Sequence, residues 1–389
     1  MPIVTNGPFM PFQKTFAGRV KGCMLSGCLA ASLNLNAQSN VTVRVMTANL
    51  SSGNNQRYQA PGLNIFQGLK PDIVAIQEFN STNSFGINTA ASLSNMIATT
   101  FGTNFSYFRE TNSGYTIPNG IISRYPILAS GSWTDSDSGV NDRGFAWALI
   151  DLPGTNDLYV VSVHLKASSG SANATRRAAE AAEVTSNIQT SFINSTNAWI
   201  IVAGDMNLYY AGTEGAITTF TTYLSDTPVP TDQGGDPDTN DSRIERYDRI
   251  LPSFAMTNLL VPVVIGTNHF TNGLVFVSTN YTPLSDVAPV QYGDSYAAGM
   301  QHMGVVKDFQ IPCTVTNVAV VPSPVLIMQS NNVIRWLGVS NLAYSVQTKT
   351  NLAATNWLPL GTAISATTNL SFTNSSAGTP QQFYRVTYP

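Results

Sequence analysis

The sequence predicts a large layered domain of the α/β or α+β class, followed by a small all-β domain. Its 389 residues are more than one hydrophobic core usually serves, so we expect two folded units. Between about residues 41 and 310, short β-rich runs alternate with a few helical ones, which is typical of layered sheets and helices. After Pro312 only an alternating β pattern remains.

The N-terminal segment predicts an export leader. Basic residues precede a mostly small and apolar run over residues 23–35, which ends at Asn36-Ala37-Gln38. We therefore expect a leader over residues 1–37 and a secreted, periplasmic or cell-surface protein. Two alternatives stay open: a mobile tail of a cytoplasmic protein, or a lipoprotein with Leu25-Ser26-Gly27-Cys28 as its lipobox.

The strands of the large domain are expected where β-branched or aromatic residues run between turn residues. Eight segments fit this description: residues 41–48, 72–77, 119–123, 144–152, 158–164, 198–203, 249–251 and 303–309.

The clearest helix is expected over residues 174–192, where it would cover a sheet. Helical spacing lets Ala178, Ala181, Ala182, Ile188 and Phe192 share a buried stripe. The same spacing assigns Arg176, Arg177, Glu180 and Glu183 to the solvent side.

The tail predicts a small β-sandwich over residues 322–389, joined by a linker over residues 313–321 to a domain over residues 38–312. Its pattern from Tyr344 to Trp357 and its final Phe-Tyr-Arg-Val resemble modules appended to secreted bacterial proteins. That resemblance carries no chemistry; a cell surface or a polysaccharide is the candidate partner of this module. Trp336, Trp357 and Tyr384 would form either a sugar-binding platform or, more commonly for alternating aromatics, a core.

The charge balance argues against strong, non-specific binding to nucleic acid. Only 11% of residues are charged and the formal net charge is −3, so any such contact must be local. Lys166, Arg176 and Arg177 form the clearest local basic cluster.

Other functional classes are also restricted. No run of 18 apolar residues predicts a membrane span, and once the leader is removed Cys313 is the only cysteine, which excludes an intrachain disulfide and a cysteine metal cluster. No protein partner is inferred.

Polar side chains follow several predicted strands at the point where each strand ends. Asn49 and Glu78 follow the first two strands, His164 ends the fifth, and Asp205 and Asn207 follow the sixth. Strand ends hold polar groups rigidly at the rim of a sheet, and here they supply two acids, amides and an imidazole from separate strands.

The order of these motifs resembles the endonuclease/exonuclease/phosphatase superfamily, which includes deoxyribonuclease I, exonuclease III, sphingomyelinases and inositol-polyphosphate phosphatases. Over residues 41–312 its motifs read Thr47-Ala48-Asn49-Leu50, Ile76-Gln77-Glu78, residues 119–127, Ser162-Val163-His164-Leu165-Lys166, Gly204-Asp205-Met206-Asn207, Tyr247-Asp248-Arg249-Ile250-Leu251 and Gln301-His302. The resemblance implies a four-layered α/β sandwich, with two packed mixed sheets flanked by helices.

The resemblance also implies roles for the metal and the water. Glu78, with Asn49 beside it, would hold Mg²⁺, with Mn²⁺ or Ca²⁺ as alternatives, and the metal would neutralise charge on a phosphate. Asp205 would accept a proton from the attacking water, and Asn207 would orient that water or bind phosphoryl oxygens.

Histidines complete the implied chemistry. His164 and His302 would stabilise the phosphoryl group or move protons, and Asp248 would hold the His302 ring in one tautomer. Whether Asp205 or the Asp248–His302 pair removes the proton of the water stays open.

One position departs from the family pattern, which normally reads Ser-Asp-His before the final strand. Here Gln301 replaces the aspartate, either as a neutral change or with weaker affinity for a second metal. Arg143, Arg124 and Gln301 are candidate substrate contacts.

Two other polar segments match no motif. His269 is expected to be structural, and the acidic segment over residues 232–241 predicts a mobile loop, solvated or binding Ca²⁺.

Together these features predict a metal-dependent phosphodiesterase that is a secreted nuclease. The alternatives are a sphingomyelinase-like phospholipid phosphodiesterase, a phosphatase, and an inactive binding protein that keeps the fold. Tyr209-Tyr210 is a faint membrane-entry signal that would suit the sphingomyelinase-like alternative.

Overall fold

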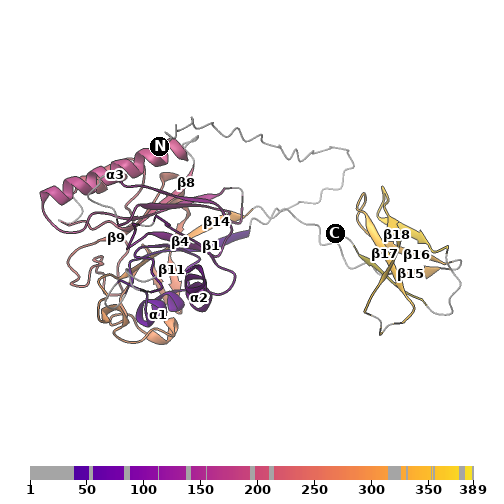
Figure 1. Cartoon of the computed structure of the whole chain (residues 1–389). Coiled ribbons are helices and arrows are strands. Elements are labelled where there is room, and N and C mark those ends of the chain that lie inside the picture. Colours follow the sequence, from indigo (N-terminus) through magenta and orange to yellow (C-terminus); the bar gives the residue numbers. More distant parts are fainter. Residues whose placement is uncertain are drawn as a thin grey trace, which may run out of the picture. The chain divides into compact units, whose positions relative to one another are not determined.

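The computed structural model describes most of the chain (Figure 1). The described residues are 39–51, 56–82, 88–112, 114–136, 142–154, 156–192, 198–209, 214–313, 326–329, 332–351, 353, 355–375 and 382–387. The predicted leader and nearly all of the predicted linker lie outside these residues. Export and the domain boundaries therefore stay predictions.

The first large sheet runs in the order β10-β14-β1-β2-β4-β3, with β13 paired to β14. β1 and β2 are parallel, and the other pairs are antiparallel, so the sheet is mixed. The strands are β1 (Ser39–Ala48), β2 (Ile73–Ile76), β3 (Ser106–Arg109), β4 (Gly120–Ser123), β10 (Leu260–Val261), β13 (Leu274–Phe276) and β14 (Gly304–Cys313).

The second large sheet runs in chain order from β5 to β9. β7 and β8 are parallel, while β5–β6, β6–β7 and β8–β9 are antiparallel. The strands are β5 (Ile127–Trp133), β6 (Phe145–Ile150), β7 (Leu158–His164), β8 (Trp199–Asp205) and β9 (Asp248–Pro252).

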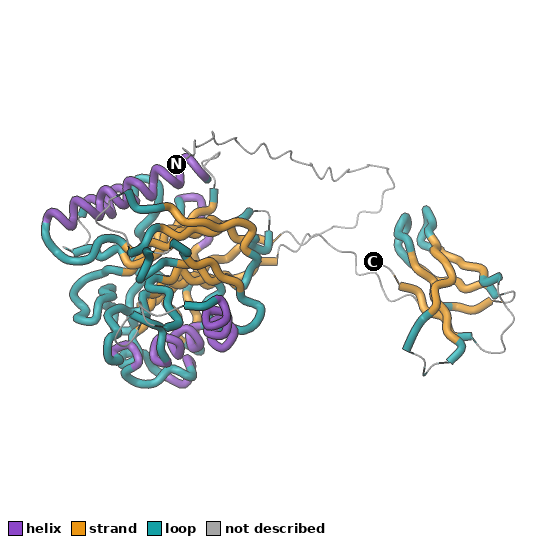
Figure 2. The backbone as a smooth tube through the Cα atoms, viewed as in Figure 1, coloured by secondary structure: helices purple, strands orange, loops and turns teal. Residues whose placement is uncertain are grey.

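Helices cover the outer face of each sheet, which completes four layers (Figure 2). One buried cluster joins α1 (Ala60–Leu69) and α2 (Ala90–Thr100) to the first sheet, and another joins α3 (Ser171–Ser191) and α4 (Gly215–Phe220) to the second. A third cluster lies between the sheets, where side chains such as Val45 and Ile201 are fully buried. Each such residue contributes roughly 1.5–3 kcal/mol through removal of apolar surface from water. The predicted four-layered α+β sandwich is confirmed.

Short elements connect the last strands of this domain. They are the hairpin of β11 (Val263–Ile265) with β12 (Asn268–Phe270) and the 3₁₀ helices η2 (Phe254–Leu259), η3 (Leu284–Val287) and η4 (Asp294–Tyr296). Within the described residues, no helix is long and apolar enough to cross a membrane.

The solvent side that was predicted for α3 is wrong in part. Arg177 and Glu180 are fully buried, whereas Ala182 is exposed. Arg177 donates to both carboxylate oxygens of Glu214, at 2.7 and 2.8 Å, and Glu180 accepts a hydrogen bond from the backbone of Lys166. Charged side chains therefore occupy the inner face of α3 because polar partners reach them from neighbouring loops.

The C-terminal residues form two three-stranded sheets with their own buried cluster. The sheet orders are β15-β16-β19 and β18-β17-β20, with β15 (Ile327–Gln329), β16 (Val333–Leu337), β17 (Tyr344–Lys349), β18 (Leu358–Ala363), β19 (Asn369–Thr373) and β20 (Phe383–Thr387). Trp336 is buried, and the cationic groups of Lys349 and Arg385 lie over the Trp357 ring, at 4.6 and 4.7 Å from the ring centroid. These small sheets agree with the predicted β-sandwich; its attachment role stays a prediction.

A buried lysine lies in the centre of the first sheet. The side chain of Lys307 is on the same face of β14 as Val305 and Phe309, which belong to the core between the sheets. Burial lowers its pKa to about 8, although Asp226 opposes the shift. The unfolded chain keeps this proton up to about 10.5, so between these pH values it binds more protons than the folded chain. For this group, stability therefore rises as pH rises from 8 to 10.5.

We expect Lys307→Met to raise the free energy of unfolding at pH 7 by roughly 1–3 kcal/mol, because it removes a charge that is costly to bury. The difference from wild type should shrink toward pH 10.5. Urea unfolding across this pH range measures both effects, with the exposed Lys70→Met as the matched control. A Lys307→Met protein less stable than wild type at pH 7 would contradict this account.

Candidate active site

The strand ends of the two sheets bring the predicted residues together. Because β1 and β2 are parallel, Asn49 and Glu78 leave the first sheet at the same edge. In the second sheet, parallel β7 and β8 pair His164 with Asp205, and antiparallel β9 pairs Asp205 with Asp248.

The last histidine arrives from the antiparallel neighbour of β1. The start of β14 pairs Val305 with Thr47, which puts the preceding His302 beside Asn49. Asn49 Nδ2 donates to Asp205 Oδ2 at 3.1 Å and lies 3.4 Å from both Glu78 Oε1 and His302 Nε2. One amide thus contacts three of the predicted site residues.

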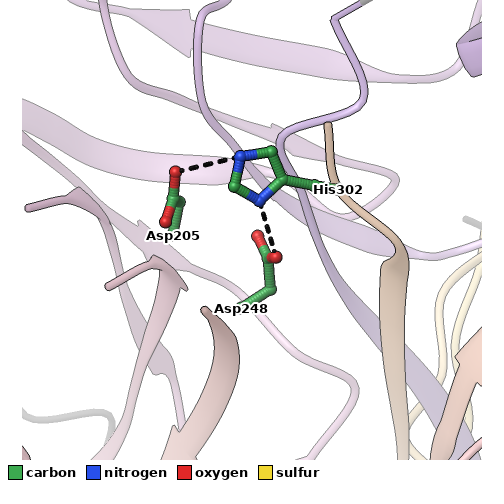
Figure 3. Close-up of side chains that lie close together, drawn as sticks. All are labelled: Asp205, Asp248 and His302. Carbon is green, nitrogen blue, oxygen red and sulfur yellow. Dashed lines mark hydrogen bonds and ion pairs between the residues drawn. The ribbon is translucent and has the colours of Figure 1, made fainter. Parts of the chain in front are cut away.

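The His302 ring lies between two carboxylates (Figure 3). Its Nδ1 is 2.9 Å from Asp248 Oδ2, and its Nε2 is 3.4 Å from Asp205 Oδ2. Burial lowers the pKa of His302, but Asp248 and Asp205 outweigh it and raise the value to about 10. The structure therefore favours an imidazolium at this position.

His164 has the opposite protonation preference. Burial, Arg143 and then His302 hold its pKa well below the usual range, so its ring is neutral. Its Nε2 lies 3.3 Å from Asp205 Oδ2, and within the described residues its buried Nδ1 has no hydrogen-bond partner. The site therefore has one charged and one neutral imidazole.

The buried charges of the site suit a divalent cation. Glu78, Asp205 and Asp248 are at most 5% exposed, and His302 is the one imidazolium among them. Burial raises the pKa of Glu78, which also accepts a hydrogen bond from the Ser51 hydroxyl. A net negative cluster of hard oxygen ligands is what Mg²⁺ and Ca²⁺ select.

Individual ligand atoms support the same fit. Asn49 Oδ1 and Asp248 Oδ1 are buried and have no hydrogen-bond partner in the described part of the chain. The ligand atoms of Asp205, Asp248 and His302 also lie within 4.8 Å of one another. Both His302 nitrogens already face carboxylates there, so Glu78 and Asn49 are better placed to hold a metal.

The backbone of the site adopts uncommon conformations. Glu78 and Asn207 have φ values of 51° and 48°, in the left-handed region of backbone conformation that residues other than Gly and Asn rarely adopt. Gly204 lies so close to β7 that a Cβ would be 1.9 Å from the carbonyl oxygen of Val163. Strain of this kind persists where surrounding contacts fix a functional geometry.

Asn207 is held by two contacts. Its backbone N–H donates to Asp205 Oδ1 at 2.9 Å, and its side-chain Nδ2 donates to the carbonyl of Leu165 at 3.1 Å. The amide therefore joins the loop after β7 to the loop after β8.

A family model supports the assignment that these residues suggest. The model for the endonuclease/exonuclease/phosphatase family matches residues 34–284, a span that contains every predicted catalytic and metal residue except His302. The chain belongs to this family. Its members hydrolyse phosphoester bonds.

Several solved structures are also similar to this chain. The chain is similar to an endonuclease/exonuclease/phosphatase from Beutenbergia cavernae, with 13% identity, coverage of 90% of this chain and 100% of that chain, and a TM-score of 0.47. It is also similar to the human nocturnin catalytic domain, with 15% identity, coverage of 71% of this chain and 97% of that chain, and a TM-score of 0.47. A third similar structure is beta toxin from Staphylococcus aureus, with 13% identity, coverage of 68% of this chain and 99% of that chain, and a TM-score of 0.44. Among curated protein sequences, no significant match was found.

The structure places Arg124 away from the other predicted site residues. Antiparallel pairing of β2 with β4 puts Gly120 beside Ile76, at the edge that leads to Glu78. Arg124 leaves β4 at the opposite edge, where it pairs with Asp72 at 3.0 Å.

Arg143 lies at the site, but most of its guanidinium N–H groups already donate to other protein groups. Its Nε and Nη2 donate to the carbonyls of His164 and Leu165, at 2.6 and 3.0 Å, and its Nη1 pairs with Asp142. Its direct contacts position the end of β7. Whether it also binds substrate stays a prediction.

Two of the three residues in the predicted basic cluster pair with carboxylates, which leaves Lys166 as its remaining cation. Arg177 is buried against Glu214, and Arg176 pairs with Asp135. Gln301 and His269 are exposed; Gln301 accepts a hydrogen bond at its backbone carbonyl from Asp241.

The acidic segment over residues 232–241 is not a solvated insertion. Asp232 is buried, pairs with Arg243 at 2.9 Å and accepts a hydrogen bond from the Asn280 amide. Thr239 Oγ1 accepts from the backbone N–H of Asp248 at 2.8 Å. Hydrogen bonds therefore build this loop into the support for Asp248.

One supporting residue was not identified from the sequence. Glu110 follows the short strand β3, as Glu78 follows β2, but Ser106–Arg109 is too short to stand out as a strand. Its carboxylate accepts hydrogen bonds from the backbone N–H groups of Asn119 and Gly144, at 2.7 and 3.2 Å, and from the Ser132 hydroxyl at 2.6 Å. Glu110 thus fixes the backbone next to Arg143.

We expect Glu110→Gln to destabilise the protein by about 1–3 kcal/mol, because the charge that strengthens the three hydrogen bonds accepted by this buried carboxylate is lost and the amide has only one acceptor oxygen. Thermal unfolding should show a lower midpoint. Glu183→Gln is the matched control, since this half-buried carboxylate accepts a hydrogen bond from the Ser136 N–H. Equal midpoints for the two variants would argue against the anchoring role.

Proposed function

We propose that this protein is a divalent-metal-dependent phosphodiesterase that uses an activated water, and that it acts as a secreted nuclease. The observation that carries the proposal is the buried arrangement of Asp205, His302 and Asp248 beside Glu78, with the Asn49 amide between them. Within the family, this combination suits hydrolysis of a phosphoester bond.

Glu78 and Asn49 are the residues that would hold the metal. Glu78 supplies a hard carboxylate, and Asn49 supplies a buried carbonyl oxygen for which the described residues offer no partner. When bound, Mg²⁺ would neutralise charge on the phosphate.

The proton of the attacking water would move to Asp205. Burial raises the pKa of this carboxyl group, which makes it a stronger proton acceptor than an exposed aspartate. As the water oxygen forms its bond to phosphorus, the bond from phosphorus to the leaving oxygen breaks in line with it, and the leaving alkoxide takes a proton from solvent. His302, held as an imidazolium by Asp248, would donate to a phosphoryl oxygen, and neutral His164 would add a second hydrogen bond.

The distribution of basic residues favours a short contact with substrate. Many arginines around this fold already pair with carboxylates: Arg44 with Asp308, Arg124 with Asp72, Arg176 with Asp135, Arg177 with Glu214, Arg243 with Asp232, and Arg246 and Arg249 with Asp226. Tight binding of a long nucleic acid requires many unpaired cations along a groove. We therefore expect recognition of the few nucleotides around the scissile bond.

We expect Asp248→Asn to lower kcat on the order of 10³-fold, because the amide cannot stabilise the His302 imidazolium. His302→Ala should cause a loss of at least the same size. Hydrolysis of bis-p-nitrophenyl phosphate with Mg²⁺ gives the readout. Asp241→Asn, an isosteric change at an exposed carboxylate on the neighbouring loop, should keep wild-type activity. Full activity in Asp248→Asn or His302→Ala would refute the assigned site.

Metal dependence gives a separate test. Removal of divalent ions with EDTA should abolish activity, and Mg²⁺ or Mn²⁺ should restore it. Glu78→Gln should raise the metal concentration needed for half-maximal activation at least about tenfold, because the charged ligand is lost. Calorimetric titration of Mg²⁺ into wild type and Glu78→Gln measures the binding directly. Unchanged activity in EDTA would exclude this mechanism.

A further inference from the structure

Two tyrosines form an aromatic shelf beside the proposed catalytic histidine. Tyr209 lies two residues after Asn207, and Tyr247 immediately precedes Asp248. The two ring centroids are 5.0 Å apart at an angle of 57°, and the Tyr247 ring lies 5.9 Å from the His302 ring. Both tyrosines are only half-buried, although their sequence neighbours in the site are buried.

A buried ion pair supports Tyr209. The Arg177 guanidinium lies 5.2 Å from the centre of the Tyr209 ring and donates to both oxygens of Glu214. Arg177 also donates to the carbonyls of Lys166 and Ser168, and Glu214 accepts from the backbone N–H of Tyr209 at 2.8 Å. These contacts fix the ring, its backbone and the cation against it as one unit.

The second tyrosine is fixed from the other side of the site. The Tyr247 carbonyl accepts a hydrogen bond from the Met206 N–H at 2.8 Å, and its ring packs against that of Tyr209. The loop after β8 and the start of β9 therefore hold the shelf at a set position relative to Asp205 and Asp248. A substrate group that contacts it is placed relative to the reacting phosphate.

The chemistry of the shelf distinguishes two kinds of ligand. Aromatic rings bind nucleobases by stacking and quaternary ammonium groups by cation–π attraction. Here Arg177 already occupies the cation position against the Tyr209 ring. A second cation on this ring would be repelled by the nearby guanidinium, whereas a neutral planar base carries no charge and would not be repelled.

We propose that Tyr209 and Tyr247 form a stacking site for the nucleobase adjacent to the scissile phosphodiester. This inference rests on the proposed phosphodiesterase function and makes it more specific: the substrate is a nucleotide diester, and Tyr209 is a specificity-determining residue. Stacking on aromatic rings is tolerant of base identity, so a preference for having a base is expected rather than a preference for one sequence.

The test compares two diesters that differ only in their bases. The first is thymidylyl-(3′→5′)-thymidine, and the second has the same sugar-phosphate backbone with hydrogen in place of each base. With Mg²⁺ and full-length wild-type protein, we expect kcat/KM to be about tenfold higher for the base-bearing diester. Tyr209→Ala should remove this preference by raising KM for the base-bearing diester, with no change for the abasic one.

Two further variants separate stacking from structural damage. Tyr209→Phe keeps the ring and should keep most of the preference. Tyr223→Ala removes a tyrosine that is 45% exposed elsewhere on the domain and should behave as wild type on both diesters. A choline phosphodiester, glycerophosphocholine, serves as the third substrate and should be insensitive to Tyr209→Ala.

The possible results are distinguishable. Equal wild-type rates on the two nucleotide backbones, an equal loss on both in Tyr209→Ala, or a loss confined to the choline diester would overturn the stacking site while leaving the phosphodiesterase function intact. If wild-type protein with Mg²⁺ hydrolyses none of these diesters or bis-p-nitrophenyl phosphate, the proposed function falls and the stacking site with it.

Discussion

The concentration of buried carboxylates at one edge of the two sheets is the constraint on which this structure depends. Glu78, Asp205 and Asp248 approach one another in a region that excludes most water, where uncompensated charge is costly. His302 offsets part of that charge, and the net negative remainder suits a divalent cation. Stability and the proposed chemistry therefore depend on the same few groups.

Strand pairing makes this concentration possible. Two parallel pairs, β1 with β2 and β7 with β8, direct Asn49, Glu78, His164 and Asp205 to the same edge of the fold. The antiparallel approach of β14 to β1 then brings His302 to it from a distant part of the chain. Side chains on packed strands lose little further entropy when they bind ligands, which favours a preorganised site.

The sequence was sufficient where local pattern and strand ends determine the outcome. The strand from Leu158 to His164 was predicted with the bounds that it has, and Asn49 and Glu78 follow strands as expected, whereas Asp205 is the last residue of its strand. Such positions can be recognised from the sequence because a buried strand appears as a hydrophobic run that ends abruptly at polar residues. The contacts among the seven residues could be expected only through the resemblance to a family.

The sequence was insufficient where tertiary partners change the meaning of a residue. Arg177 and Glu180 have the spacing and charge of a solvent-facing pair, yet both lie inside, because Glu214 and the backbone of Lys166 compensate them. Arg124 follows a family motif, but the direction of β4 places it at the far edge. Neither partner choice nor strand direction is encoded in residues close along the chain.

The pairing of arginines with carboxylates inside the fold also affects substrate recognition. An arginine that balances a buried carboxylate is not free to bind a phosphate, so each internal pair such as Arg177–Glu214 removes a cation from the surface. In return, that pair fixes the Tyr209 ring against a guanidinium beside the site. A phosphodiesterase built in this way loses long-range attraction for a polyanion and gains a short-range contact for a flat, neutral group. Its selectivity should therefore depend weakly on salt and strongly on what is attached next to the scissile phosphate.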